Sequence, residues 1–144
     1  MLDTAFLLNI IPERYKELEV SELDKYLAMA RGYQGENGDV KALAMKKWFN
    51  TNYHYLVPEI NKDTTIKANF SKLLNEYKEA KSAGFETRPT IIGPYTFLVL
   101  ADYKSGATKD TVLSDVIVAF QTLLKELNQL GVEWLQIEEP ALVL

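Results

Sequence analysis

The sequence of 144 residues contains no cysteine and a single histidine, His54. Without cysteine the chain can form no disulfide, and it offers no thiolate as a metal ligand or as a nucleophile. Zinc sites usually combine several histidine or cysteine side chains, so one histidine is too few for such a site. We therefore predict that this chain holds no metal ion by itself.

Long apolar runs and an excess of positive charge are also missing. No apolar stretch approaches the ~20 residues that a membrane-spanning helix requires. The formal net charge is −4 at pH 7, so neither nucleic acid nor an anionic membrane surface should attract the chain. The first residues carry Asp3 where a secretory signal would carry basic residues. These features predict a cytoplasmic protein without nucleic-acid or membrane partners.

The composition that remains is that of an ordinary globular protein, with 47% hydrophobic and 25% charged residues. At this length one domain is expected. Helical spacing predicts a short apolar helix that stops near Pro12. A second helix should run from Ser21, with Asp24 completing a box-like start, to a cap at Gly32. A polar, glycine-rich loop and a short helix over residues 40–49 are expected to follow.

From residue 53 onward the predicted elements alternate as strand, helix, strand, helix, strand. The strands lie in "NYHYLVPE", "RPTIIGPYTF" and "VEWLQIEEPALVL", and amphipathic helices span residues 69–83 and 112–130. Such alternation predicts βαβ units and a parallel sheet, an α/β fold. Pro58, Pro94 and Pro140 should mark the carboxyl ends of the strands, the edge at which α/β proteins bind ligands.

Three segments resemble one known family. They are "ARGYQGENGDVKALAMKKWFNTNYHYLVPE", "RPTIIGPYTFLVLA" and "GVEWLQIEEPALV", and they are similar to the N-terminal domain of cobalamin-independent methionine synthase. That family is the 5-methyltetrahydropteroyltriglutamate–homocysteine methyltransferases. The resemblance extends over essentially the whole chain, and the rare residues of "KWFNTNYHY" make it specific.

The resemblance implies a fold and a different role for each of two domains. Family members have two (βα)8 barrels, of which the C-terminal one holds zinc and homocysteine. The N-terminal barrel lacks the metal and helps to bind the polyglutamate tail of the folate. A barrel takes roughly 250 residues, so residues 1–144 are predicted to form a single partial domain, a partial (βα)8 TIM barrel. The first strand and a basic run should precede Met1, and the closing strands should follow Leu144.

Lys47 is the main candidate site residue, because the family holds a lysine at the matching position of "KWFNTNYHY", where it contacts the folate tail. A tail of several carboxylates needs cations along its path. Arg31, ahead of the glycine-rich loop, is a weaker candidate for the same tail. The alternative for both is a solvated charge at a helix end, where the dipole favours cations.

Other conspicuous side chains are given structural roles. His54 is expected to be a hydrogen-bonded structural residue, and the aromatic residues Trp48, Phe49, Tyr53 and Tyr55 are expected in the core instead of stacking on a pterin. The adjacent carboxylates Glu138 and Glu139 point to opposite faces of a strand, so they form no acid/base pair. The family usually has aspartate at position 138, and this departure leaves the role of that carboxylate open. Glu139 is expected to bind backbone amides or a cation at the rim.

These expectations combine into one functional hypothesis. The chain is the folate-binding N-terminal segment of the methyltransferase, with no catalytic residue and no cofactor of its own, and inactive alone. Zinc is expected in the C-terminal domain. Its partners should be 5-methyltetrahydropteroyl polyglutamate and the remainder of the methyltransferase chain. The alternative is a stand-alone, non-catalytic binding or scaffold module that self-associates to complete its half-barrel. A barrel enzyme similar to uroporphyrinogen decarboxylase is a third, less supported reading.

Overall fold

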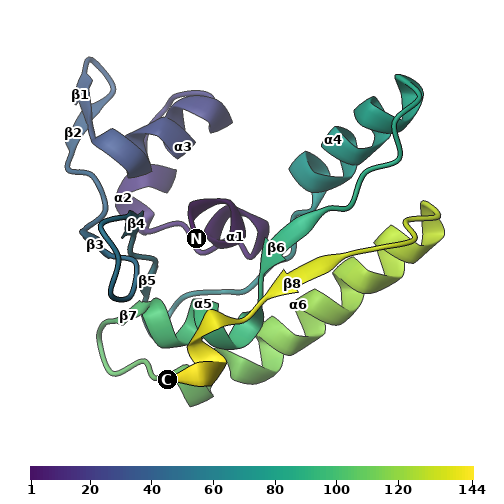
Figure 1. Cartoon of the computed structure of the whole chain (residues 1–144). Coiled ribbons are helices and arrows are strands. Elements are labelled where there is room, and N and C mark those ends of the chain that lie inside the picture. Colours follow the sequence, from purple (N-terminus) through teal and green to yellow (C-terminus); the bar gives the residue numbers. More distant parts are fainter.

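The computed structural model describes all residues from 1 to 144, and it arranges them as small sheets with helices packed against them (Figure 1). The helices are α1 (Leu2–Leu7), α2 (Glu13–Lys16), α3 (Glu22–Arg31), α4 (Ser71–Ser82), α5 (Pro94–Leu100), α6 (Lys109–Gln129) and the 3₁₀ turn η1 (Pro140–Val143). The strands are β1 (Tyr33–Gly35), β2 (Gly38–Val40), β3 (Met45–Lys47), β4 (His54–Leu56), β5 (Glu59–Ile60), β6 (Thr90–Ile92), β7 (Asp102–Tyr103) and β8 (Gln136–Glu138).

The strands form four separate pairs. β1 pairs with β2 and β3 with β4, both antiparallel, whereas β5 pairs with β7 and β6 with β8 in parallel. From β5 onward strands and helices alternate, which confirms the predicted α/β character. The two parallel pairs are not joined into one sheet, and no closed barrel is present.

The helices with strong local signals begin and end close to where the sequence predicts. The hydroxyl of Ser21 accepts a hydrogen bond from the Asp24 amide at 3.1 Å, and Gly32 ends α3 with a φ of 80° that favours glycine. A capping box of Thr108 and Thr111, which was not predicted, starts α6 at Lys109, shortly before the expected start at residue 112. The hydrogen bonds that begin and end α3 are set by residues close together in sequence, which is why these two ends could be predicted.

Residues 40–49 do not form the predicted helix. They finish β2 and form β3, whose Met45 pairs with Leu56 and whose Lys47 pairs with His54. The helix-forming composition of this stretch is overridden by pairing with β4, as tertiary contacts often override propensity.

Two further predictions about the middle of the chain are wrong. The segment 53–57 is not a parallel strand covered on both faces, because β4 pairs antiparallel with β3 and His54 is exposed. The parallel strand is β5, which begins immediately after Pro58, where a proline costs no ladder hydrogen bond. The sequence did not predict α5 and β7, because both are too short to show a clear period. The N-terminal apolar helix ends at Leu7, well before Pro12.

The larger core lies between α6, α5 and the β6–β8 pair, with α1 closing its other side (Figure 1). From α6 it takes Val116, Phe120 and Leu123, which recur at helical spacing and are almost fully buried. A smaller core around Tyr15 and Met29 joins α2 and α3. The strand β8 is less covered than predicted, since Ile137 is exposed. None of the helices has the length and apolarity needed to cross a bilayer.

Adjacent leucines of α6 provide a test of this packing. Leu123 is 0% exposed and Leu124 is 47% exposed. Leu123→Ala should lower the free energy of unfolding by about 2–5 kcal/mol, because it leaves a cavity, whereas Leu124→Ala should cost less than about 1 kcal/mol. Urea unfolding followed by circular dichroism measures both. Equal losses for the two variants would show that α6 packs by a different face.

Candidate functional site

Lys47 lies at the end of β3, on the hairpin formed by residues 45–56, which we call the Lys47 hairpin. Residues paired across an antiparallel ladder project to the same side. Lys47 therefore shares a face with its partner His54, whereas Lys46 shares the opposite face with Tyr55. Both lysines are exposed and neither forms an ion pair within the chain. The alternative for Lys47, a solvated charge at a helix end, is wrong about the helix, because this residue lies in a strand, but the exposure of Lys47 fits a solvated charge.

The turn of the Lys47 hairpin is held by hydrogen bonds and aromatic contacts. The Trp48 amide donates to the Tyr53 carbonyl at 2.7 Å, and the Thr51 hydroxyl donates to the Trp48 carbonyl at 2.6 Å. The Trp48 ring packs edge-on against Phe49 at 4.8 Å and Tyr55 at 5.7 Å. These contacts hold the turn that directly follows Lys47.

Tyr55 fastens the hairpin to the rest of the molecule. Its hydroxyl donates to the Leu100 carbonyl at 3.1 Å, and burial raises the pKa of this tyrosine. Lys47 is thus presented to solvent from a hairpin that is anchored at its base to the end of α5.

Two structural roles predicted for this hairpin are wrong. Tyr53 is 78% exposed and does not belong to the core, while Trp48, Phe49 and Tyr55 form a half-buried cluster at the surface. His54 is exposed and its ring makes no hydrogen bond within the chain. One face of this hairpin is open to solvent, and alternation of residue types alone does not reveal which face that is.

Arg31 occupies the last turn of α3 and is exposed. It makes no ion pair, and no hydrogen bond or shared partner joins it to Lys47. The structure therefore leaves both predicted cations free but does not assemble them into one contact.

A charged cluster beside β5 and β7 had no signal in the sequence. The Arg14 guanidinium donates to both carboxylate oxygens of Glu59, at 2.7 and 2.9 Å, and this pairing raises the pKa of the arginine further. Arg14 also donates to the Tyr15 hydroxyl, which in turn donates to the Lys41 carbonyl at 2.6 Å. Because Arg14 and Glu59 are 45 residues apart, no local spacing could have revealed the pair. Its bidentate geometry fixes α2 to the start of β5.

The carboxyl ends of β6 and β8 are joined by a contact that we call the Glu139 clamp. The amides of Tyr95 and Thr96 donate to the two carboxylate oxygens of Glu139, at 2.9 and 2.7 Å. The Ala141 amide donates to the buried Thr96 hydroxyl at 3.1 Å. Gly93 is essential here, because a Cβ at this position would overlap the Glu139 side chain. The prediction that Glu139 binds backbone amides is confirmed.

The neighbouring carboxylate has a different environment. Glu138 is exposed and accepts a hydrogen bond from the Gln136 side chain at 2.7 Å. Both oxygens of Glu139 already have amide donors, so the two glutamates do not work as a pair. No group of three or more histidine, aspartate and glutamate side chains is arranged to hold a metal ion.

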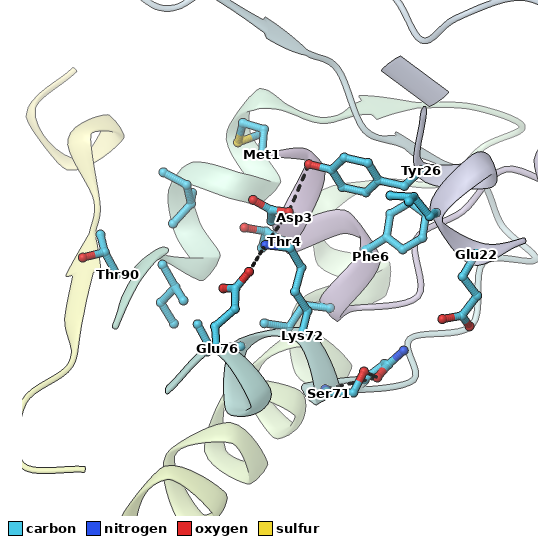
Figure 2. A pocket seen from close by; sticks show the side chains of 16 residues that line it. Met1, Asp3, Thr4, Phe6, Glu22, Tyr26, Ser71, Lys72, Glu76 and Thr90 are labelled. Atoms are coloured by element: carbon cyan, nitrogen blue, oxygen red, sulfur yellow. Dashed lines mark hydrogen bonds and ion pairs between the residues drawn. The ribbon is translucent and has the colours of Figure 1, made fainter. Parts of the chain in front are cut away.

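One recess lies apart from all these residues. It has a volume of about 390 Å3 and is bordered by α1, α3, the start of α4 and β6 (Figure 2). We call it the α1–α3–α4 recess. Its apolar wall includes Phe6, whose ring lies 5.1 Å from that of Tyr26. The Tyr26 hydroxyl donates to Asp3 at 3.1 Å, and burial raises the pKa of this tyrosine. No sequence signal pointed to this recess, because its walls come from distant parts of the chain.

Comparison with known proteins decides the family. The profile described as "Cobalamin-independent synthase, N-terminal domain" matches residues 1–144. The chain belongs to the cobalamin-independent synthase family. This confirms the resemblance to cobalamin-independent methionine synthase that "KWFNTNYHY" and the other two segments carry.

Several proteins that are similar to this chain are named as 5-methyltetrahydropteroyltriglutamate–homocysteine methyltransferases. One from Lactococcus lactis subsp. lactis (strain IL1403) is 85% identical over 143 residues. One from Lactococcus lactis subsp. cremoris (strain SK11) is 71% identical, and one from Streptococcus thermophilus is 51% identical. Each match covers 99% of this chain and 19% of the relative. The chain thus spans about one fifth of the length of these methyltransferases.

The Glu139 clamp generates a direct test. Glu139→Ala should lower the free energy of unfolding by about 1.5–3 kcal/mol, because hydrogen bonds to a charged group are lost from the start of α5. Glu138→Ala removes an equal charge from an exposed neighbour and should change stability by less than about 0.5 kcal/mol. Urea unfolding measures the two variants. Equal effects would mean that the clamp does not stabilise the strand ends.

Proposed function

We propose that this chain is the part of a methyltransferase's N-terminal domain that holds the glutamate tail of the folate substrate. The observation that carries the proposal is the position of Lys47, exposed and unpaired on an anchored hairpin. The relatives are named for a triglutamate substrate, and a chain of carboxylates is bound through charge-assisted hydrogen bonds from cations. Arg31 is a second, weaker contact for that tail.

The proposal assigns binding, and not bond making, to these residues. In the complete enzyme a methyl group passes from the folate to the thiol of homocysteine. Zinc, which the proposal places in another part of that enzyme, supplies activation of the thiol there. The remainder of the methyltransferase chain is accordingly a partner of this segment. A cytoplasmic location is part of the same proposal, and a chain without cysteine is compatible with it.

The proposal also includes the fold that the family implies, a partial (βα)8 barrel. Two features support it. The pairs β5–β7 and β6–β8 are parallel, and the chain alternates strands with helices from β5 onward. The Glu139 clamp lies at the carboxyl ends of β6 and β8, the end at which barrel proteins keep their sites.

The rival reading is a self-associating binding module. The exposed apolar residues Ile117, Val118 and Leu124 of α6 and Ile137 of β8 favour it, since they leave apolar surface for a second copy. The family match and the identity to much longer methyltransferases favour the first reading. Sedimentation analysis separates the two, because the module should be a dimer without any folate.

Lys46 provides a matched control for Lys47, since it has the same charge, the same strand and the opposite face. Lys47→Ala should weaken binding of 5-methyltetrahydropteroyltriglutamate by about tenfold or more, the effect of losing one charge-assisted hydrogen bond. Binding of the monoglutamate should change less. Lys46→Ala should leave the triglutamate affinity within about twofold. The affinities are measured by calorimetric titration of the native, full-length protein. Equal losses for the two lysines would overturn the assignment.

Residues 1–144 alone, supplied with the folate, homocysteine and zinc, should transfer no methyl group above background. The expected reason is that no side chain of this segment has a bond-making role. Formation of methionine is the readout, and the complete methyltransferase of Lactococcus lactis serves as the positive control. Turnover by the segment itself would contradict the proposal.

A further inference from the structure

The only histidine of the chain lies directly opposite Lys47 in the β3–β4 ladder. Hydrogen-bonded and non-hydrogen-bonded pairs alternate along an antiparallel ladder. Because the Trp48 amide donates to the Tyr53 carbonyl at 2.7 Å, the preceding pair, Lys47 with His54, is of the non-hydrogen-bonded kind. In such pairs the Cα atoms lie about 4.5 Å apart, closer than in hydrogen-bonded pairs. The two side chains therefore leave one face of the hairpin next to each other, and we call them the Lys47–His54 pair.

Neither member of the Lys47–His54 pair has a partner within the chain. Both residues are exposed, and neither side chain forms an ion pair or a hydrogen bond. The other pair on this face, Met45 with Leu56, is apolar, so no carboxylate of the ladder competes for the two donors. Two cationic groups directly opposite each other repel, and a carboxylate between them removes this repulsion. The face is thus suited to an anion.

The backbone that carries the Lys47–His54 pair is fixed on both sides. The turn is closed by the hydrogen bonds around Trp48. On the side away from the turn, the Val57 amide donates to the Ala44 carbonyl at 2.8 Å, and the Tyr55 hydroxyl donates to the Leu100 carbonyl. An anion that uses both donors has to order two side chains but no backbone. Such preorganisation lowers the entropic cost of binding.

We propose that His54 is a second contact for the folate tail, and that one carboxylate of the tail bridges Lys47 and His54. This inference rests on the proposed function of Lys47 and extends it. The Lys47 ammonium and the protonated imidazole each donate a hydrogen bond to the same carboxylate. Hydrogen bonds in which both groups are charged are the strong ones. Arg31 is not joined to this pair and is not needed for the bridge.

The bridge makes binding of the tail depend on pH. An imidazole changes its charge between about pH 5 and pH 8, and a neighbouring carboxylate favours the charged form. The main neighbour of β4 is β3. The titratable group that β3 turns toward His54 is Lys47, because Lys46 and Tyr55 occupy the opposite face. Binding of the tail should therefore take up protons near neutral pH, and the affinity should rise as the pH falls.

The test is calorimetric titration of 5-methyltetrahydropteroyltriglutamate into the native, full-length protein at about pH 6 and about pH 8. His54→Ala should weaken binding about fivefold at the lower pH and less than about twofold at the higher pH, because the bridging hydrogen bond needs the charged imidazole. Titrations in buffers with different ionisation enthalpies give the number of protons taken up, which should fall in His54→Ala. Since His54 is exposed, the variant should fold normally, and circular dichroism checks this.

Two further variants serve as controls. His54→Lys supplies a permanent positive charge at the same position, so it should bind the triglutamate tightly at both pH values without the uptake of protons. Lys46→Ala removes a charge from the opposite face of the hairpin. It should keep both the affinity and the proton uptake of the unaltered protein.

Lys47→Ala, titrated in the same way, separates this inference from the proposed function. If Lys47→Ala weakens binding and His54→Ala does not at either pH, the bridge is overturned and the role of Lys47 stands. Equal losses for His54→Ala at the two pH values also overturn the bridge, because they would arise from the fold of the hairpin and not from the charge of the imidazole. If Lys47→Ala has no effect, the proposed function fails and the bridge fails with it.

Discussion

The carboxylate of Glu139 joins two turns of the chain that are separated by 44 residues. It receives the free amides at the start of α5 while its own backbone follows directly after β8. The Thr96 hydroxyl completes the contact by accepting from Ala141. This contact helps to fix α5 on the β6–β8 pair, together with the fully buried Phe97 and Leu98 of α5. The hairpin that presents Lys47 rests on α5 through Tyr55, so its placement depends on the same clamp indirectly.

The Lys47 hairpin and the α1–α3–α4 recess differ in how they are built. Lys47 lies on a local hairpin whose turn is closed by its own residues, and a single hydroxyl fastens it to the rest of the molecule. The α1–α3–α4 recess is assembled from segments that are far apart in sequence and meet only in the folded chain. A basic, exposed strand end suits a flexible polyanionic tail, because the tail can be held by charge without being enclosed.

The sequence predicted what is governed by neighbours along the chain. The start of α3 at Ser21, its end at Gly32 and the apolar stripe of α6 all follow from local capping and period. The errors lie where long-range pairing decides. Residues 40–49 have helix-forming composition, yet pairing with β4 makes them a strand.

The candidate site likewise contains some residues that the sequence could identify and some contacts that it could not. Lys47 was found through a family resemblance, and no physical rule in the sequence distinguishes it from Lys46. The role of Glu139 followed from its place at a strand end. The Arg14–Glu59 pair and the recess around Thr4 depend on contacts across long stretches of chain, which hydrophobic periodicity does not report.

The absence of a side chain at Gly93 limits which substitutions positions 93 and 139 can accept during evolution. A methyl group at this position would occupy the space of the Glu139 carboxylate, so the two positions are not free to vary independently. A side chain at 93 would turn the Glu139 carboxylate away from the amides of Tyr95 and Thr96, or would require a shorter residue at 139. In either case the two amides would need another acceptor.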